Sequence, residues 1–461
     1  MTPPVKEHRV LSTLNQDGTR HWLRPRLANG RFLRWRRIVG FALIALFVFL
    51  PRIRIGGRPA LLIDLSEREL DVFGLVFRPS DGVVLMLLGL TIVLAVFLVT
   101  ALFGRVWCGW GCPQSVYLEQ VFRPIERWLE GSAAQQAKLP RLHWRRVAKW
   151  TIYAALSFAL SNVFLAYFVG TDRLEHWVFG SPLDHLGGFT IVMGVAALML
   201  FNFAYFREQT CIVACPYGRL QTVLLDKQSL IVGYDAKRGE PRGKPKKKLP
   251  VIEQRGSCVD CGACVDVCPT GIDIREGLQM ECIGCAQCID ACDTVMDKLG
   301  QPRHLIGYTS QDRLAGKPGK LLRARTIIYP ALLALVAGLF VWSVGTKSVA
   351  DVFVERMTGP SFVDLPDGRV AARVQLKIEN ASDEARGYTI SLVDAPDAEL
   401  RSAQASWRVK PRHSIDVPLF VDVQPGTFTG GKRQVYLRIN DSEGFEKIVA
   451  VTLLGPERSK P

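Results

Sequence analysis

Eight of the twelve cysteines in this chain lie in one short block with a repeated spacing. The block contains two C-x2-C-x2-C-x3-C motifs, at residues 258–268 and 282–292. Bacterial ferredoxins with two [4Fe–4S] clusters use this spacing, and the fourth cysteine of each motif binds the cluster of the other motif. The spacing therefore predicts two clusters. Their predicted ligands are Cys258, Cys261, Cys264 and Cys292 for one cluster, and Cys282, Cys285, Cys288 and Cys268 for the other.

Zinc sites and disulfide bonds are the other common uses of clustered cysteines, and both fit this block less well. Zinc sites use pairs of C-x2-C with longer gaps and often include histidine. Disulfide bonds need an oxidising compartment, whereas the charge pattern described below places the block in the cytoplasm. Asp293 follows Cys292 where Pro269 follows Cys268, a departure that removes no ligand.

Long apolar runs predict a membrane protein. Four of them are long enough to cross a bilayer core, which needs about 20 residues. A fifth run, the first in the chain, is shorter and is flanked by arginines. We count it as a span whose arginines reach the interface, and a re-entrant segment is the alternative. The runs cover residues 38–51, 82–103, 150–169, 186–206 and 326–344.

Lysine and arginine are concentrated in residues 1–37 and 104–149 and are sparse in residues 171–184. The positive-inside rule therefore predicts an inner-membrane protein with a cytoplasmic N-terminus and cysteine block and a periplasmic C-terminal part. The net charge of +15 is mostly a signal of this topology. The basic run 244–248 lacks interleaved aromatic residues, so we expect contact with solvent or membrane lipid and no nucleic-acid partner.

Short segments of alternating apolar and polar residues begin after residue 346 and are separated by turn signals. They predict an antiparallel β-sandwich of immunoglobulin type. This part has no acidic pair or histidine cluster that indicates a catalytic site. We interpret it as a binding or scaffolding domain, and a passive folded tail is the alternative.

The predicted fold is thus a multi-domain membrane protein. An α-helical transmembrane bundle of about five spans carries an inserted ferredoxin-like domain with two [4Fe–4S] clusters and a C-terminal immunoglobulin-like β-sandwich. The predicted parts are the cytoplasmic tail 1–37, the four-span region 38–206, the second C-x3-C-P unit with its basic linker 207–250, the ferredoxin domain 251–310, the fifth span 326–344 and the sandwich 346–461.

The remaining four cysteines form two C-x3-C-P motifs, Cys108/Cys112-Pro113 and Cys211/Cys215-Pro216. Each motif directly follows the predicted cytoplasmic end of a span, and its proline suits the first turn of a following helix. We interpret the two segments as an internal repeat whose four thiols meet near the membrane surface. Such thiols suit Cu(I), zinc, another Fe–S cluster or a redox-active dithiol, and packing alone is the alternative. The histidines are scattered, and His176 and His185 are the two considered as candidate metal ligands.

The ordered combination of spans, C-x3-C-P pairs, ferredoxin block and sandwich resembles the family of cytochrome c oxidase accessory proteins called CcoG, FixG or RdxA. Residues 51–65 and Phe73-Gly-Leu also resemble the first periplasmic loop of that family. The resemblance covers nearly the whole chain. It implies a cupric reductase that converts Cu(II) to Cu(I) for assembly of cbb3-type cytochrome oxidase, with oxidase subunits or assembly proteins as partners. It also implies copper binding and redox catalysis by Cys108, Cys112, Cys211 and Cys215.

Two other functions stay open. The first is an electron-wiring or quinol-oxidising subunit similar to the NapH-type ferredoxins, which also carry C-x3-C-P pairs. The second is an assembly scaffold whose clusters act as redox sensors. The sequence has no Gly-rich loop for a dinucleotide or phosphate, so we expect a separate cytoplasmic electron donor. It identifies neither that donor nor the oligomeric state, and a homo-oligomer stays open.

Overall fold

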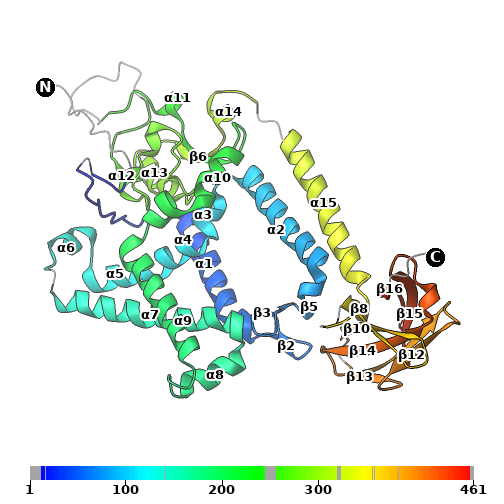
Figure 1. The fold of residues 1–461 in the computed structure, drawn as a ribbon. Coiled ribbons are helices and arrows are strands. Elements are labelled where there is room, and N and C mark those ends of the chain that lie inside the picture. Colours follow the sequence, from blue (N-terminus) through cyan, green and yellow to red (C-terminus); the bar gives the residue numbers. More distant parts are fainter. Residues whose placement is uncertain are drawn as a thin grey trace, which may run out of the picture. The chain divides into compact units, whose positions relative to one another are not determined.

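A computed structural model describes residues 12–15, 17–140, 142–243, 256–318, 323–355, 357, 359–382 and 384–456 (Figure 1). The chain divides into two compact units, Met1–Val341 and Trp342–Pro461. Predicted linker residues 244–250 and the start of the predicted ferredoxin domain, residues 251–255, lie outside the described residues.

Among the described residues, four helices are long and apolar enough to cross a membrane, and they coincide with the four long runs in the sequence. Few of their side chains are buried inside the protein, only 6 % of the apolar window in α2 and in α15. A 22-residue helix such as α2 is about 33 Å long, close to the thickness of a bilayer core. The helices are α2 (Gly82–Phe103), α7 (Trp144–Val169), α9 (Leu186–Leu200) with its π-helical extension (Phe201–Phe206), and α15 (Ala324–Gly345).

The predicted first span falls on α1 (Arg31–Phe49) and the 3-10 turn Leu50–Arg52. The first turns of α1 are rich in arginine, so only its second half is as apolar as the four helices above. Arg36 is buried there, and its Nε donates a hydrogen bond to the carbonyl of Gly109 at 3.0 Å. The charged half of α1 therefore contacts protein, and the total of five spans stays a prediction.

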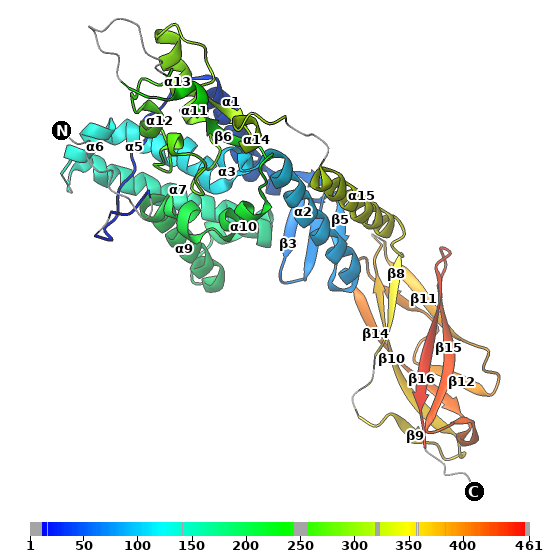
Figure 2. The same ribbon diagram turned by 90° about the horizontal axis from the view of Figure 1, so that it is seen from above.

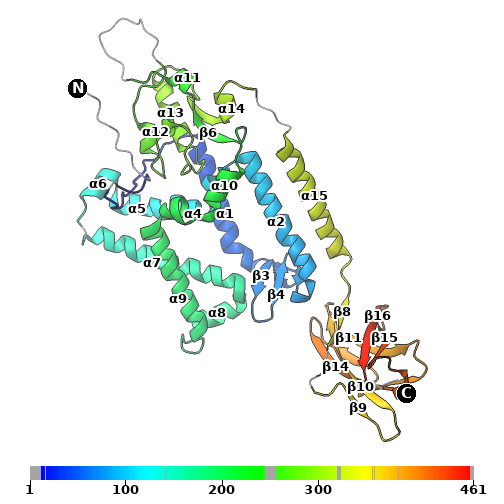
Figure 3. The ribbon, with the colours of Figure 1, turned by 45° about the horizontal axis from the view of Figure 1, so that its top comes forward.

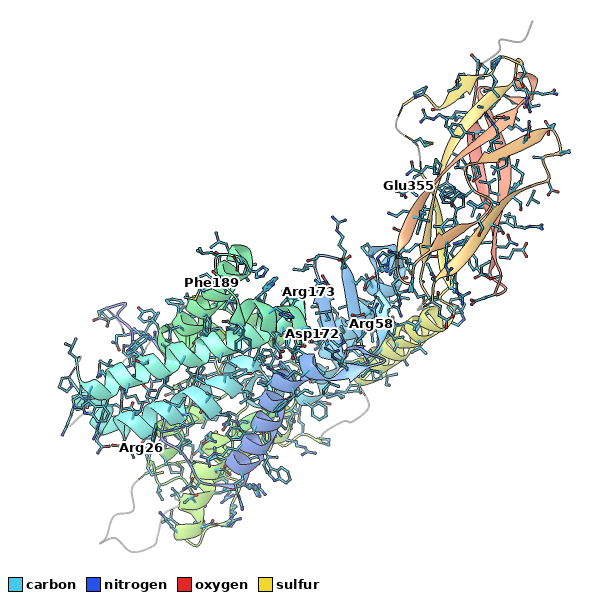
Figure 4. The ribbon with its side chains drawn as sticks, turned by 90° about the horizontal axis from the view of Figure 1, so that it is seen from below. Arg26, Arg58, Asp172, Arg173, Phe189 and Glu355 are labelled. Carbon is cyan, nitrogen blue, oxygen red and sulfur yellow. The ribbon has the colours of Figure 1, made fainter. Side chains whose placement is uncertain are left out.

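The loop between α1 and α2 forms a small antiparallel sheet, β3-β4-β5, next to the hairpin β1-β2. Gly56 and Gly57 make the hairpin turn, both with positive φ. Arg54 pairs with Asp172 at 2.6 Å, and Figure 4 places Asp172 near Arg58. The strands are β1 (Arg54–Ile55), β2 (Arg58–Pro59), β3 (Leu61–Asp64), β4 (Glu69–Val72) and β5 (Leu75–Phe77), and the turn before α2 is Pro79–Asp81.

Short helices connect the long ones. They include two π-helical segments, Leu118–Phe122 and Thr210–Ala214. Segments of this kind are rare and occur often at functional sites. The other short helices are α3 (Val106–Trp110), α4 (Pro113–Tyr117), α5 (Arg123–Glu130), α6 (Ala133–Lys138), α8 (Thr171–Phe179) and α10 (Pro216–Leu224).

The cysteine block folds around a core that contains its own sulfur atoms together with Ile289, Met296 and Leu305. Strands β6 and β7 pair antiparallel and join the two ends of this part. Its elements are β6 (Ile231–Tyr234), α11 (Ala236–Gly239), α12 (Ala263–Asp266), the 3-10 turn Ile274–Glu276, α13 (Gln287–Lys298), β7 (Ile306–Thr309) and α14 (Gln311–Leu314).

The C-terminal unit is the predicted β-sandwich, with sheets β12-β14-β10-β8 and β13-β11-β15-β16, and β9 paired to β10. Alternate residues of β10 are buried, as expected for a strand with one face on a core. Figure 2 shows β15 and β16 as a long pair. The strands are β8 (Ala350–Glu355), β9 (Phe362–Asp364), β10 (Val370–Asn380), β11 (Arg386–Val393), β12 (Ala398–Ser402), β13 (Trp407–Val409), β14 (Ser414–Val423), β15 (Lys432–Asp441) and β16 (Glu446–Leu454), with the 3-10 turn Pro425–Thr427.

Candidate functional site

The eight cysteines of the block line two neighbouring cavities. Each cavity takes three cysteines from one motif and the fourth from the other motif, which is the grouping that the spacing predicts. Cys264 borders both cavities. The cavities are lined by Cys258, Cys261, Cys264 and Cys292 in one case, and by Cys282, Cys285, Cys288 and Cys268 in the other.

The two motifs reach this arrangement with the same local backbone. Gly262 takes a left-handed conformation directly before α12, and Ala286 takes one directly before α13, with φ values of 72° and 61°. A left-handed alanine costs about 1 kcal/mol, and such conformations persist where the surroundings require them. In each motif the turn lets the chain change direction between its second and third cysteines.

Burial lowers the acidity of three of these thiols. It raises the pKa of Cys264 and Cys285 to about 11 and that of Cys282 to about 12. Without iron these three thiols are therefore protonated at neutral pH, and binding of a cluster would release their protons. A low-dielectric set of four sulfur ligands is the donor chemistry that an Fe–S cluster requires.

The structure also brings the four C-x3-C-P cysteines together. Burial, followed by the neighbouring Cys112, Cys108 and Cys215 thiols, raises the pKa of Cys211 to about 12, so all four sulfurs lie within electrostatic range. Burial likewise raises the pKa of Cys108 to about 11. Within the described part of the chain, however, no three Cys, His, Asp or Glu side chains have the arrangement of ligands around a single metal ion.

The two C-x3-C-P motifs have matching local structures. Cys112 and Cys215 are the extended residues that precede α4 and α10, and Pro113 and Pro216 begin those helices. Proline is favoured there because its fixed φ suits the helix and its missing N–H has no helical partner. Cys211 lies in the π-helical segment Thr210–Ala214. The matching ends agree with the interpretation of an internal repeat.

The first C-x3-C-P loop packs directly on the loop that carries Cys282 and Cys285. A β-carbon at Gly109 would lie 2.7 Å from the carbonyl oxygen of Ile283 and 2.8 Å from the backbone nitrogen of Cys285. On the other side of the contact, a β-carbon at Gly284 would lie 3.1 Å from the carbonyl oxygen of Arg105. Only glycine allows the two backbones to approach this closely.

Hydrogen bonds hold the same contact in place. The guanidinium of Arg105 donates to the carbonyls of Met280 and Cys282 and, at 2.7 Å, to that of Gly218 on α10. The Tyr308 hydroxyl donates to the carbonyl of Gly284 at 2.8 Å. Arg105 thus joins the cluster loop to both thiol motifs.

Sequence reasoning missed Gln221, a fully buried residue of α10. Its Oε1 accepts a hydrogen bond from the Cys108 thiol at 3.2 Å, and its Nε2 has no hydrogen-bond partner in the structure. A thiol donates to the amide oxygen, whereas a metal-bound thiolate would accept from the amide nitrogen. The only sequence signal for Gln221 is its position within two helical turns of Cys215.

We expect Gln221→Leu to lower the midpoint potential of a metal bound by the four thiols. Loss of a hydrogen bond of about 1 kcal/mol to a ligand sulfur corresponds to roughly 40 mV for one electron. Redox titration followed by EPR measures this shift, and the exposed Gln301→Leu is the control. An unchanged potential in Gln221→Leu would assign Gln221 to packing only.

A buried network of ion pairs, also missed by sequence reasoning, lies beside the thiol motifs. Arg123 contacts Glu119 and also Glu208, at 3.1 Å, while Arg207 contacts Glu126 at 3.1 Å. Burial raises the pKa of Glu126, but Arg207, Lys149 and Arg123 lower it more, so the net pKa lies below its usual value. The Glu126 carboxylate therefore stays charged. The network ties the segment after Cys112 to the residues just before Cys211.

The two histidines considered as ligands lie apart from these sites. His176 is in α8, and the ring of His185 stacks on Trp177 at 5.0 Å between centroids. The stacking gives His185 a packing role.

Comparison with known proteins identifies the family. Protein RdxB of Cereibacter sphaeroides is 36 % identical, with 82 % of this chain and 83 % of that protein covered. The chain belongs to the FixG/RdxA family. Protein RdxA of the same organism is 34 % identical over 92 % of this chain and 94 % of its own length, and the nitrogen fixation protein FixG of Rhizobium meliloti is 31 % identical over 92 % and 91 %.

Three domain families match within this FixG/RdxA member. Residues 206–311 match a 4Fe-4S dicluster domain, and residues 85–131 match a 4Fe-4S binding domain. Residues 340–456 match the IG-like fold at the C-terminus of FixG. The predicted family and fold class are therefore confirmed. The protein is a membrane-associated iron–sulfur electron-transfer protein with two [4Fe–4S] clusters in its dicluster domain.

Proposed function

We propose that this FixG/RdxA protein passes single electrons from its clusters to copper near the membrane surface, for assembly of a cytochrome oxidase. The close contact of Gly109 with the loop of Cys282 and Cys285 is the observation that carries this proposal. It brings the backbone of the thiol loop into direct contact with the backbone of the loop that carries two of the proposed cluster ligands. Electrons would leave the cluster block there.

The proposed ligands of the clusters are the two sets of cysteines that line the two cavities. When bound, the clusters would supply electrons one at a time. The protein's own contribution is to bury Cys264, Cys285 and Cys292 away from water and to hold Cys268 and Cys292 in the cavity of the opposite motif. The proposed ligand sets are Cys258, Cys261, Cys264 and Cys292, and Cys282, Cys285, Cys288 and Cys268.

Copper fits the four-thiol site by its chemistry. Reduction of Cu(II) to Cu(I) needs one electron and no proton, which matches a one-electron donor. Soft thiolates then bind the Cu(I) product in preference to harder ions. The thiols assigned to this step are Cys108, Cys112, Cys211 and Cys215. Bound copper would have to draw them closer together, because no single-ion arrangement exists among the described side chains.

A third cluster in the four-thiol site is the second candidate. Residues 85–131, which include Cys108 and Cys112, match a 4Fe-4S binding domain. A cube also separates its four ligands more widely than a single ion does, which suits thiols that are near one another without forming a mononuclear site. The protein would then wire electrons to a membrane partner, as a NapH-type subunit would.

Replacing all four C-x3-C-P cysteines with serine should abolish Cu(I) formation and leave the dicluster domain loaded. The wild-type protein, purified anaerobically in detergent, should contain about eight irons per chain for two clusters and about twelve for three. Iron analysis, EPR and a Cu(I)-specific chelator dye measure these quantities. Cu(I) formation that survives in the quadruple variant would refute the thiol role, and loss of about four irons would favour the third cluster.

The proposed setting is the bacterial inner membrane, with the N-terminus and cluster block in the cytoplasm and the sandwich in the periplasm. The excess of Lys and Arg in residues 104–149 supports this orientation. Oxidase subunits or assembly proteins would meet the sandwich, and an electron donor would meet the cluster block. Cysteine-accessibility labelling in whole cells tests the orientation.

A further inference from the structure

A cavity of about 510 Å³ lies where the N-terminal end of α1 meets β6, α11, β7 and α14. Figure 3 shows β6, α11 and α14 gathered near this end of α1. Its volume is within the usual range for small-molecule sites, about 300–1,000 Å³. Neither the clusters nor the C-x3-C-P thiols occupy it, so it is a separate site.

The lining of this cavity is strongly basic. Arg31, Lys237 and Arg313 contribute three cations, and Asp235 contributes the only carboxylate among the lining residues. Asp235 already accepts a hydrogen bond from the backbone N–H of Arg238. Within the described ranges, no ion pair engages the Arg31, Lys237 or Arg313 side chains. Three such cations around one cavity favour a phosphate group, which accepts charge-assisted hydrogen bonds from them.

The cavity also has an aromatic wall. Phe32 and Tyr308 line it, and their rings meet edge to face with centroids 5.6 Å apart. The guanidinium of Arg31 lies 4.8 Å from the Phe32 ring. Aromatic faces and an arginine plane beside them suit a flat conjugated ring. The lining therefore combines recognition of a phosphate with recognition of an aromatic ring.

The same cavity borders one cluster site and is linked to the other by a hydrogen bond. Leu305, which is 1 % exposed, lines this cavity and also the cavity of Cys258 and Cys292. Tyr308 lines it as well and donates a hydrogen bond to Gly284 in the loop of the other cluster. The Leu305 side chain thus separates a ligand here from the cavity of Cys258 and Cys292.

We propose that this cavity binds a phosphorylated aromatic electron carrier of the flavin mononucleotide class, and that electrons enter the protein here. Oxidation of one reduced flavin releases two electrons and two protons. Each of the two [4Fe–4S]²⁺ clusters takes one electron to become [4Fe–4S]⁺, and the protons pass to solvent. A nicotinamide fits less well, because it transfers a hydride whereas a cluster takes single electrons. The electron-entry role rests on the proposed function, and the binding does not.

Titration of the full-length protein, purified anaerobically with its clusters, tests the site. Flavin mononucleotide fluorescence should be quenched on binding, and riboflavin, which lacks the phosphate, should bind at least about tenfold more weakly, equal to ~1.4 kcal/mol. Lys237→Glu combined with Arg313→Glu should weaken flavin mononucleotide binding by at least the same factor. Lys298→Glu, at an exposed position of α13 outside the cavity, is the matched control.

Each outcome decides the proposal. Equal affinity for riboflavin, unchanged binding in the double variant, or reduction of the clusters by NADH or by an acidic redox protein but not by reduced flavin would overturn it. The same titration on the quadruple C-x3-C-P serine variant separates the two proposals. Retained flavin binding without Cu(I) formation there supports the cavity independently of the copper site.

Discussion

Gly109→Ala is expected to slow electron transfer from the clusters to the four-thiol site on the order of 100-fold, with the iron content unchanged. The added β-carbon would lie 2.7–2.8 Å from the backbone of Ile283 and Cys285. Backbone cannot move aside as a flexible side chain can, so the two loops must separate. A wider gap between the two loops slows electron transfer between them, while every cysteine ligand is retained.

Stopped-flow spectroscopy of dithionite-reduced protein mixed with Cu(II) measures this rate as reoxidation of the clusters. Gly194→Ala in α9 is the control, because a β-carbon there meets nothing within 4 Å. A Gly109→Ala protein that reoxidises as fast as the wild type would show that electrons leave the cluster block elsewhere. A protein that has lost iron would show that the contact is structural.

Arg123→Met is expected to destabilise the protein by about 3–5 kcal/mol. Arg123 is 2 % exposed and contacts Glu119 and Glu208, so its loss leaves Glu119 without its main cation, whereas Glu208 keeps its pair with Arg20. Burial raises the pKa of Glu119, but Arg123, Arg36 and Arg127 lower it more, and the net pKa is below its usual value. The orphaned carboxylate would have to take up a proton or draw in water.

The same guanidinium donates to the carbonyl of Pro269, the residue after Cys268, at 3.3 Å. Arg123→Met should therefore also release iron at a lower temperature than the wild type. Thermal unfolding in detergent, with iron release followed by absorbance, measures both effects. Arg303→Met removes an exposed pair with Asp297 and should cost less than about 1 kcal/mol. Equal midpoints for the two variants would contradict a structural role of the network.

The parts of the fold that could be predicted are marked by patterns among residues that lie close together in the sequence. Cysteine spacing specified which sulfurs share a cavity, because three ligands come from one tight loop. The lengths of the apolar runs predicted the four long helices. The alternation of apolar and polar residues predicted the β-sandwich. The first span was harder, since α1 begins at Arg31 in an arginine-rich turn and buries Arg36 in a contact inside the protein.

The missed features depend on residues far apart in the chain. Arg123 and Glu208 form a hydrogen bond although they are 85 positions apart in the sequence, and Cys108 and Gln221 do so although they are 113 positions apart. No local pattern marks such partners, because a charged residue on an amphipathic helix usually faces solvent. Gly109 was visible only as a small residue inside the C-x3-C-P motif. Its role depends on the position of the cluster loop, which only the folded chain defines.

The pairing of β6 with β7 makes the cluster block a separable insertion in the chain. Ile231 lies opposite Thr309, so the chain enters and leaves the cluster block at one place. The block is therefore an insertion whose two ends are already joined to each other. We therefore expect that such an insertion can be exchanged for another of different redox potential without changing the path of the helices, provided that the new block keeps the contacts with Gly109, Arg105 and Arg123.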